Sequence, residues 1–504
     1  MSRLVAAIVA QAADRGSMSD ELHFAAHDWA ERRHLDHGRA NLLRSLDLPP
    51  SARVLHVGAG TGALTRYLGE TVAEVVAVEA DAGAAEVLAA RTAGLPGVTV
   101  RTGLPDGQFD VAVAIGVLEP LAKDERAGLL RELRARLRPG GTLCVAVDNR
   151  FGARALAGAP DRSTGRRWDA VEGYPFGAPA RAMSRQQVIT ELTAAGFSVD
   201  DVLGCFPDHL VTRAVLSPEL LTRYPRLAVE LPRLPSPDHG HDSPRPVDEA
   251  RLWAGLVEAG QADGAWNSIL VLAAVSGAPA EPLWPASRLA AYFNTDRAAR
   301  WCTRAEVTAS GQVRRTPMLE LPGEDTEVSV QAWTDPVYDG PTLVDLLVAK
   351  PWLAEDKLTA WRDLVTERAA ELGSALWDLM PHNVVVTADG TLHPIDLEWR
   401  WTPATVESVV DRGLLLVAEQ LAAAAWAGAG GGTVRDLAGW LGTLLGRSPD
   451  FVPAAVAREA RFQALRQYGD TPVALEREEG KIRTAWYTRL DEAVVVREMP
   501  GEGG

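Results

Sequence analysis

The sequence predicts an α/β protein with more than one domain: a mainly parallel sheet with helices on both faces, followed by a separate α+β domain. Three observations support this prediction. The chain has 504 residues, which is too many for a single hydrophobic core. Short apolar runs alternate with helical segments through residues 51–147. A glycine-rich turn follows the first of these runs, as expected where a parallel strand meets a helix.

Composition limits the possible classes of function. Apolar residues make up 47% of the chain and the formal net charge is -16, so we expect a well-buried globular protein that does not bind nucleic acid. The N-terminus lacks a signal-peptide pattern, and the Ala-rich stretch 413–429 contains Glu419, which favours a buried helix over a transmembrane segment. The cysteines lack metal-ligand spacing, which predicts a reducing, cytoplasmic location; they are Cys144, Cys205 and Cys302.

The elements of the first domain follow from its apolar runs. Residues 1–50 have helical patterns. Predicted strands cover 53–57, 74–79, 98–101, 109–115 and 142–147. Predicted helices between them cover 63–68, 84–93 and 123–137. A looser segment with one helix near 186–195 comes next, and a late strand at 267–274 closes the sheet.

Composition shifts predict the domain boundaries. An N-terminal helical segment (1–50) belongs to the first domain (51–275), and a linker rich in proline and small residues follows (276–286). The second domain covers 287–450, and a charged helical tail covers 451–504.

A ligand site is predicted where the first strand meets the first helix. Gly58, Gly60 and Gly62, with Thr61 among them, permit a tight turn and a close approach of a ligand to the backbone. Glu79 ends the second strand, where a carboxylate accepts hydrogen bonds from both ribose hydroxyls of a nucleotide. These features alone fit a nicotinamide enzyme and a methyl-donor enzyme equally.

Later segments separate these two classes. Gln108-Phe109-Asp110 opens the fourth strand, Gly116-Val117-Leu118-Glu119 follows it, and Leu137-Arg138-Pro139-Gly140-Gly141 precedes the fifth. In order and spacing they resemble class I methyltransferases. The resemblance implies a Rossmann-like fold and S-adenosyl-L-methionine (SAM) as cofactor, with Gly116 at its site. A second nucleotide-binding half is not evident, which disfavours a dinucleotide enzyme.

One position departs from the class I pattern. Members usually place Asp or Glu two residues before the first glycine, where it helps to hold the methionine end of the donor, and here that residue is His56. Neutral histidine can still form a hydrogen bond, and protonated histidine could meet the donor carboxylate. A rearranged methionine pocket is the alternative.

Unusual short segments recur through the first domain. They include Arg33-His34-Leu35, Arg39-Ala40-Asn41-Leu42-Leu43, Asp148-Asn149-Arg150-Phe151-Gly152, Gly158-Ala159-Pro160-Asp161, Val171-Glu172-Gly173-Tyr174, Phe206-Pro207-Asp208 and Trp266-Asn267-Ser268. Together they resemble a bacterial group in which a methyltransferase is joined to a kinase-like domain, found among surface-polysaccharide and O-antigen chain-terminating enzymes. The resemblance implies a small-molecule or glycan acceptor carrying hydroxyls or phosphates, and partners in a polysaccharide or natural-product assembly. It adds His34 and Arg39 to the cofactor-binding candidates.

Transfer of a methyl group to oxygen needs positioning and a base for the hydroxyl proton. The candidate bases are His209, Glu119, Asp161 and Glu172. His209 fits equally a loop histidine that bonds a backbone carbonyl, and Glu119 fits equally a carboxylate at a helix N-terminus. The group usually has a histidine where Ser163 stands and Tyr-Lys where His209-Leu210 stands, so the base is open at this point.

The second domain contains an Asp-x₄-Asn pattern. Asp378 and Asn383 have this spacing, and Asp396 follows a predicted hairpin formed by 384–386 and 392–395. These segments resemble the catalytic loop and metal-binding segment of kinase-like small-molecule phosphotransferases. The resemblance implies a catalytic Asp378, with Asn383 and Asp396 as Mg²⁺ ligands for ATP.

The phosphate-binding parts of such a site are missing from the sequence. Between Leu283 and Asp345 there is no lysine, and no glycine-rich phosphate loop is visible. Arg314 or Arg315 is a candidate substitute, although arginine for lysine is not conservative at such a site. Three readings of the chain stay open: a methyltransferase with an attached kinase-like domain, a phosphotransferase with a vestigial methyltransferase half, and a non-catalytic scaffold.

Overall fold

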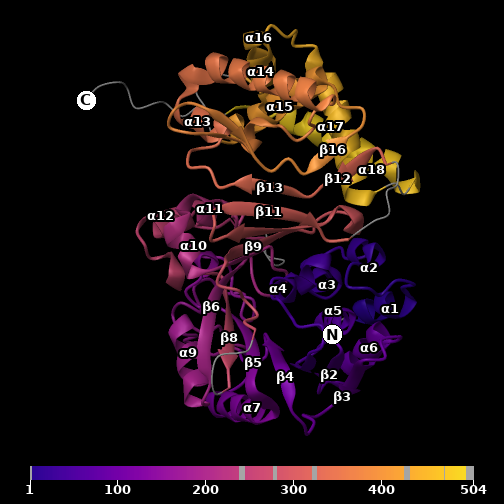
Figure 1. Cartoon of the computed structure of the whole chain (residues 1–504), viewed down its shortest axis with the longest axis vertical. Helices are drawn as coiled ribbons and strands as arrows, with labels where there is room; N and C mark the ends of the chain where they lie inside the picture. Colours follow the sequence, from indigo (N-terminus) through magenta and orange to yellow (C-terminus); the bar gives the residue numbers. More distant parts are fainter. Residues whose placement is uncertain are drawn as a thin grey trace. The chain divides into compact units, whose positions relative to one another are not determined.

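The computed structural model describes residues 3–237, 244–275, 281–319, 326–424, 432–469 and 472–494. The chain forms two compact units (Figure 1). The first consists of residues 1–295 and 304–310, and the second of residues 296–303 and 311–504.

The first unit is built on a sheet whose order is β10-β9-β7-β6-β8-β5-β4-β1-β2-β3. Strands β1 to β5 are parallel to one another, whereas the pairs β5–β8, β8–β6, β6–β7 and β7–β9 are antiparallel. The strands are β1 (Arg53–Val57), β2 (Glu74–Val78), β3 (Val98–Arg101), β4 (Phe109–Ile115), β5 (Leu137–Asp148), β6 (Ser198–Phe206), β7 (Ala214–Leu216), β8 (Ser268–Ala274), β9 (Arg288–Asn294) and β10 (Thr303–Thr308).

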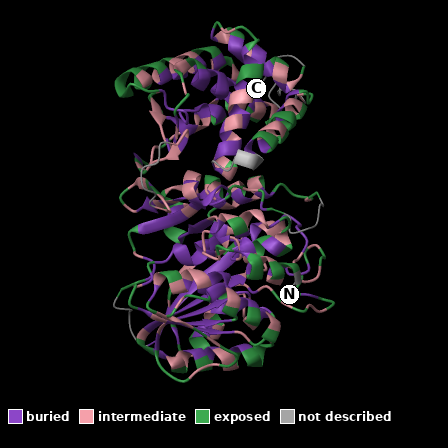
Figure 2. Ribbon diagram, turned by 90° about the vertical axis from the view of Figure 1, so that its right-hand side faces the viewer, coloured by how far each residue is buried: buried purple, intermediate pink, exposed green. Residues whose placement is uncertain are grey.

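Helices cover both faces of this sheet. The helices are α1 (Arg3–Gln11), α2 (Asp20–Phe24), α3 (Trp29–Leu35), α4 (Asn41–Arg44), α5 (Ala63–Thr71), α6 (Ala82–Thr92), α7 (Lys123–Arg136), α8 (Ala153–Leu156), α9 (Arg185–Ala194), α10 (Pro218–Arg223), α11 (Pro225–Glu230) and α12 (Glu249–Glu258). Because side chains alternate along a strand, Val76 and Val78 of β2 pack with α7 and α9, whereas Ala77 packs with Leu88 of α6. The central strands β1, β4 and β8 are mostly or fully buried (Figure 2), which explains their continuous apolar runs. The edge strand β3 alternates between half-buried and exposed residues.

The second unit mixes strands and helices. Its elements are β11 (Gln312–Pro317), β12 (Val328–Val330), β13 (Trp333–Pro336), α13 (Leu343–Ala349), α14 (Ala354–Leu372), β14 (Val384–Val386), β15 (Leu392–Pro394), β16 (Trp399–Trp401), α15 (Val406–Ala423), α16 (Val434–Leu444), α17 (Phe451–Tyr468) and α18 (Pro472–Leu490). The three pairs β11–β13, β12–β16 and β14–β15 are antiparallel. The hairpin predicted after Asn383 is therefore confirmed as β14–β15.

The predicted boundary between the domains needs correction. Strand β9 lies beyond the predicted linker, yet it pairs with β7 through Ala214, opposite Tyr292, and so belongs to the first sheet. Leu283 and Trp284 are buried, although they fall within that linker; residues 276–280 lie outside the described residues. Almost every residue of β9 is buried, which explains why the strand lies within the first sheet beside a neighbouring strand.

The predicted C-terminal tail is also corrected. Phe462 of α17 is buried among the rings of Trp377, Trp399 and Trp401, with ring centroids 5.4–6.4 Å apart. Helices α17 and α18 pack against each other. The charged residues that suggested a tail occupy the outer faces of helices whose inner faces form the core of the second unit.

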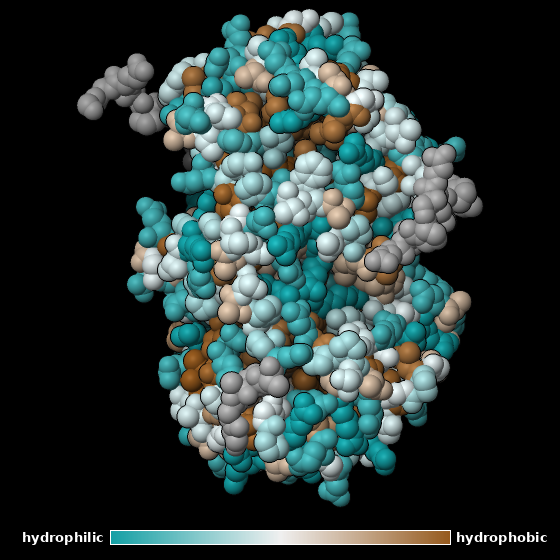
Figure 3. Space-filling view, viewed as in Figure 1, coloured by the Kyte–Doolittle hydropathy of each residue, from teal (hydrophilic) through white to brown (hydrophobic). Residues whose placement is uncertain are grey.

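Among the described residues, no helix is both long and apolar enough to cross a membrane. Helix α15, which contains the Ala-rich candidate segment up to Ala423, is mostly buried. On the face drawn in Figure 3, hydrophilic residues predominate and hydrophobic ones are scattered in small groups. This distribution agrees with the high net charge of the sequence.

Replacing Gly204 by alanine tests the packing in the antiparallel half of the first sheet. The added Cβ would lie 2.3 Å from the ring of Trp266, so we expect the free energy of unfolding to fall by about 1–3 kcal/mol. Gly255 on α12 has open space at the same position, and Gly255→Ala should raise stability by up to about 1 kcal/mol. Urea denaturation of both variants makes the comparison; equal stabilities would contradict this packing.

Candidate active site

The glycine loop lies between β1 and α5, at the carboxyl end of the parallel strands. The N–H groups of Gly58 and Ala59 donate to the carbonyl of Val78, and the N–H of Gly60 donates to Glu79 Oε2 at 2.7 Å. Gly60 has a φ of 54°, and a Cβ there would meet no atom within 4 Å. The loop is thus held from one side by β2 and open on the other, where a ligand can approach the backbone.

Glu79 lies directly after β2 and supports two turns with its carboxylate. Besides the bond to Gly60, its Oε1 accepts the N–H of Asp81 at 2.9 Å. Asp81 in turn caps α6 by accepting the N–H of Ala84. The carboxylate is therefore fixed beside the open side of the loop, in the position predicted for a ribose contact.

Basic residues from the N-terminal segment line the same side of the loop. His34 Nδ1 is 2.9 Å from the hydroxyl of Thr61, and Arg91 donates to the carbonyl of His34. Burial, with help from nearby arginines, lowers the pKa of His34 to about 3, so this ring is neutral. Arg39 donates to the carbonyls of His209 and Leu210, at 3.4 and 3.1 Å.

His56 lies beneath the loop. Its side chain is buried, and Nδ1 is 2.9 Å from the hydroxyl of Thr65 on α5. Burial lowers the pKa of His56 to about 3. A neutral ring held against α5 fits the expectation of a hydrogen-bonding histidine and disfavours a protonated one at the donor carboxylate.

His209 stands at the centre of a hydrogen-bonded chain. Its Nδ1 is 3.1 Å from Ser268 Oγ and 3.3 Å from Asp148 Oδ1. Ser268 donates its hydroxyl to Asp148 at 2.9 Å. The other ring nitrogen, Nε2, faces Gly116, where a Cβ would lie only 3.2 Å away. Glycine at 116 therefore leaves room for the ring beside the loop that follows β4.

Asp148 stays ionised in this arrangement. Burial acts to raise its pKa, but Arg162 and His209 outweigh burial and hold the pKa well below the usual range. Arg162 lies 2.9 Å from Asp148 and 3.3 Å from Asp208. Glu119 differs, because burial raises its pKa while His209, 3.9 Å from its carboxylate, partly opposes that effect.

Asp161 organises the loop that follows α8. Its Oδ1 accepts the N–H groups of Ser163 and Thr164, and its Oδ2 accepts the hydroxyl of Tyr174 at 3.1 Å. Ser163 also lies 2.8 Å from the carbonyl of Ala180. Ser163 thus stabilises its own loop. None of these contacts involves His209. Within the part of the chain that the structure describes, Glu172 makes a single bond, from its backbone N–H to the carbonyl of Trp168.

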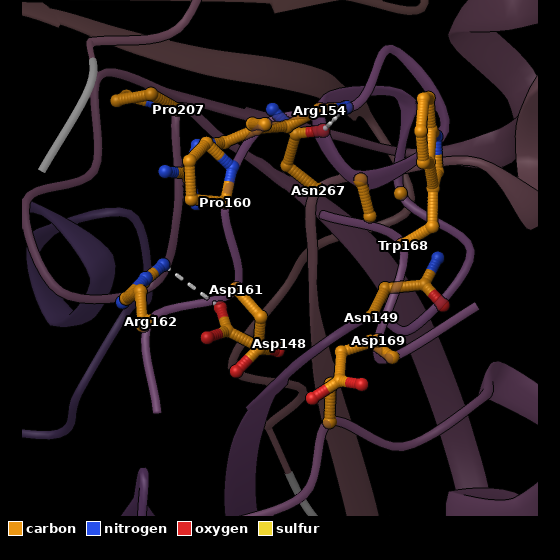
Figure 4. A pocket seen from close by; sticks show the side chains of 15 residues that line it. Asp148, Asn149, Arg154, Pro160, Asp161, Arg162, Trp168, Asp169, Pro207 and Asn267 are labelled. Carbon is orange, nitrogen blue, oxygen red and sulfur yellow. Dashed lines mark hydrogen bonds and ion pairs between the residues drawn. The ribbon is translucent and has the colours of Figure 1, made fainter. Parts of the chain in front are cut away.

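A pocket lies beside Asp148 (Figure 4). Its lining includes Asp148, Asp161, Arg154, Arg162 and Trp168. In Figure 4, Arg154 extends along the top of the pocket and the Trp168 ring stands at one side, with Asp148 and Asp161 below. Since Asp148 both lines the pocket and contacts His209, the pocket adjoins the histidine.

The second unit brings Asp378, Asn383 and Asp396 into one region. The Asn383 amide donates to the carbonyl of Asp378 at 3.0 Å, and Asp396 has a φ of 59°. Burial raises the pKa of Asp378 to about 8, and the charge of Asp396 adds to the effect although Arg412 opposes it. The Asp396 N–H donates to Asp335 of β13.

Arg315 of β11 neutralises the acids of this region. Its guanidinium forms an ion pair with Asp396 and lies 3.5 Å from Glu398. Glu398 also pairs with Arg297 at 3.0 Å. Among the described residues, no group of three or more His, Cys, Asp or Glu side chains has the geometry of a metal site. The predicted ligands Asn383 and Asp396 therefore do not fit a resident Mg²⁺, because a guanidinium already contacts Asp396.

The first unit, by contrast, fits a nucleoside-type donor. The glycine loop leaves open space above Gly60, and the Glu79 carboxylate is fixed beside it. Residues 55–145 match the family described as "Methyltransferase domain". The N-terminal half contains a class I SAM-dependent methyltransferase domain. S-adenosyl-L-methionine is the cofactor of this domain, as the sequence predicted.

Individual relatives agree with this assignment. Over 138 residues the chain is 33% identical to a protein-L-isoaspartate O-methyltransferase of Methylorubrum extorquens (strain PA1), covering 27% of this chain and 58% of that protein. The chain thus spans less than two thirds of this relative.

Two solved structures are also similar to the methyltransferase domain. A SAM-dependent methyltransferase from Mesorhizobium loti has 19% identity, with 46% of this chain and 95% of that chain covered and a TM-score of 0.28. The N-methyltransferase NodS from Bradyrhizobium japonicum WM9 has 14% identity, with 49% and 97% covered and a TM-score of 0.29.

The sequence did not single out three residues that the structure places at His209. Asp148 and Ser268 stood out in the sequence only as parts of longer segments, and Arg162 did not stand out. A signal was available for Asp148, because it ends the fifth strand at the carboxyl edge of the sheet, where ligands of such folds bind. Ser268 had no comparable signal, because its pairing with β5 depends on the antiparallel insertion of β8.

Substituting Gly60 tests the donor site. Arginine there would fill the open space of the loop, so we expect S-adenosylhomocysteine to bind about tenfold more weakly or worse. Gly94 offers a matched control, since it also has a positive φ and open space but precedes β3 at the opposite edge of the sheet. Calorimetry on Gly60→Arg and Gly94→Arg compares them; unchanged affinity in Gly60→Arg would place the donor elsewhere.

Proposed function

We propose that the methyltransferase domain transfers a methyl group from SAM to a hydroxyl oxygen of a sugar, glycan or sugar-phosphate acceptor, with His209 as general base. The observation that carries this proposal is the chain of contacts from His209 through Ser268 to Asp148. Its position at the carboxyl edge of the parallel strands, next to a pocket, supports the proposal.

The hydrogen bonds determine which nitrogen of His209 is free. Ser268 donates its own proton to Asp148, so its oxygen is left to accept the N–H at Nδ1 of His209. This tautomer leaves Nε2 without a proton, directed toward Gly116. The imidazole is thus prepared to accept a proton from an acceptor hydroxyl, and ionised Asp148 stabilises the charge that the ring gains.

The remaining residues position the two substrates. When bound, SAM supplies an electrophilic methyl group, which leaves as its carbon–sulfur bond breaks. The glycine loop and Glu79 would hold the nucleoside end, while His34 and Arg39 would face the same site. Arg39 also fixes the backbone of His209 and Leu210, which keeps the base in place. Glu119, near Nε2, is suited to stabilising the imidazolium once the proton has moved.

Replacing His209 by glutamine removes the base while keeping a polar side chain. We expect methyl transfer to fall by about 10²–10⁴-fold, since general-base catalysis contributes an effect of this size. Labelled donor incubated with host extract measures the transfer, and calorimetry with S-adenosylhomocysteine should show donor affinity unchanged.

Two further variants serve as comparisons for His209→Gln. Asp148→Asn should reduce transfer in the same direction, because an amide would no longer stabilise the charged ring. His393→Gln, which alters a histidine of the second unit, should retain full activity. Full activity in His209→Gln would exclude His209 as the base.

For the second unit we propose a kinase-like scaffold that supports or docks partners in a biosynthetic assembly and does not transfer phosphate. The supporting observation is the contact of Arg315 with both Asp396 and Glu398. A guanidinium in contact with the proposed metal ligand competes with a divalent cation for the same charge. The alternative, a phosphotransferase with a vestigial methyltransferase half, predicts binding of ATP with Mg²⁺.

The variant Asp396→Asn tests whether Asp396 is an ion-pair partner of Arg315 or a metal ligand. If Asp396 is the ion-pair partner of Arg315, its loss leaves Glu398, 3.5 Å away and shared with Arg297, as the remaining acid, and the second unit should lose up to about 3 kcal/mol of stability even in EDTA. The exposed Asp356 is the control, and Asp356→Asn should change stability by less than about 1 kcal/mol. Denaturation in EDTA measures both. A rise in the melting temperature of the wild type with ATP and Mg²⁺, but not with ATP in EDTA, would contradict the scaffold.

A further inference from the structure

The pocket beside Asp148 contains a positive charge that its surroundings leave unmatched. Within the described part of the chain, the guanidinium of Arg154 forms no hydrogen bond or ion pair. The backbone of Arg154 is bonded: its N–H donates to Asn267 Oδ1 at 2.8 Å, and its carbonyl accepts the N–H of Ala159 at 3.1 Å. Figure 4 shows the side chain along the upper side of the pocket. An arginine in such a position is available to a ligand.

The acids near Arg154 are engaged elsewhere. The carboxylates that act on it most strongly are those of Asp148 and Asp208, and both lie within 3.3 Å of Arg162. Asp169, which also lines the pocket, pairs with Arg166 at 2.6 Å. Asp161 uses its oxygens on the N–H groups and the tyrosine hydroxyl of its own loop. Within the described residues, the Arg154 guanidinium therefore lies on the pocket wall without a paired carboxylate.

Arg154 is half-buried, and this partial burial is unfavourable unless an anion joins it. A guanidinium removed from water loses solvation that only a charged or strongly polar partner can replace. Burial, with Arg162 adding to the effect, lowers the pKa of Arg154 to about 10, so the side chain is still protonated at neutral pH. Guanidinium groups bind carboxylates and phosphates through two parallel hydrogen bonds, which makes such oxyanions the matching ligands.

We propose that Arg154 binds an oxyanion, a carboxylate or a phosphate, carried by the methyl acceptor at a position other than the methylated hydroxyl. The inference rests on the proposed methyl transfer, because it takes this pocket as the acceptor site. Asp148 links the two functions, because His209 contacts it and it also lines the pocket that contains Arg154. The Trp168 ring belongs to the same lining and offers a flat apolar surface suited to the face of a sugar ring.

The experiment tests whether the labelled product carries a negative charge. Wild-type protein is incubated with labelled donor and host extract, and the product is passed over an anion-exchange resin at neutral pH before and after phosphatase treatment. We expect the product to be retained. Release after phosphatase identifies a phosphate, and retention after phosphatase identifies a carboxylate. A labelled product that is not retained would overturn the inference while supporting methyl transfer itself.

Arg154→Met provides the second arm, with Arg131→Met on α7 as a control. At low extract concentration the labelling rate of Arg154→Met should fall about tenfold or more and should approach the wild-type rate at high concentration, because acceptor binding is weakened. Arg131→Met should match the wild type. Equal rates for Arg154→Met and wild type at low concentration would overturn the inference.

Absence of labelled product from the wild type would contradict the proposed function instead. Calorimetric titration of the proteins with inorganic phosphate and with acetate then decides the inference directly. Binding to the wild type that is lost in Arg154→Met supports an oxyanion site, and equal binding or none overturns it.

Discussion

The insertion of β8 between β5 and β6 is the constraint on which the candidate active site depends. In this register Asp148 lies opposite Ser268, and Ser268 lies opposite Cys205 of β6. His209 follows β6 by a few residues, so its ring reaches both side chains. A shift of β8 by one residue would turn Ser268 to the other face of the sheet and break the chain of contacts. Sheet pairing therefore sets the tautomer of the histidine.

The charged groups of the two units are matched differently. In the second unit, Arg297 and Arg315 hold the pKa of Glu398 below its usual range, against the effect of burial. Arg315 also forms an ion pair with Asp396, so both acids have an arginine partner within the second unit. In the first unit, Arg162 serves Asp148 and Asp208 together. One cation, Arg154, then remains to face a pocket.

The parts of the structure that the sequence predicted are those that local patterns determine. Strands β1 to β5, the glycine loop and Glu79 follow from apolar runs and from turns that need glycine. Strand β6 was missed, because two adjacent acids, Asp200 and Asp201, interrupt its alternation where the register shifts against β8. The contacts of His209 were also beyond local patterns. Ser268 lies 59 residues from His209 and 120 from Asp148, and only the order of strands brings them together.

The same limit explains why the domain boundary was misplaced. Proline and small residues at 276–286 indicate a turn, but a turn is a boundary only if the next strand joins another core. Strand β9 instead pairs with β7, and Arg288 at its start contacts Asp47 at 2.8 Å, more than 200 positions earlier in the chain. The methyltransferase domain thus uses residues from beyond its apparent end to complete its sheet. A truncation at 275 would expose the edge of β7 and the apolar residues that β9 covers, so the domain needs these later residues to fold.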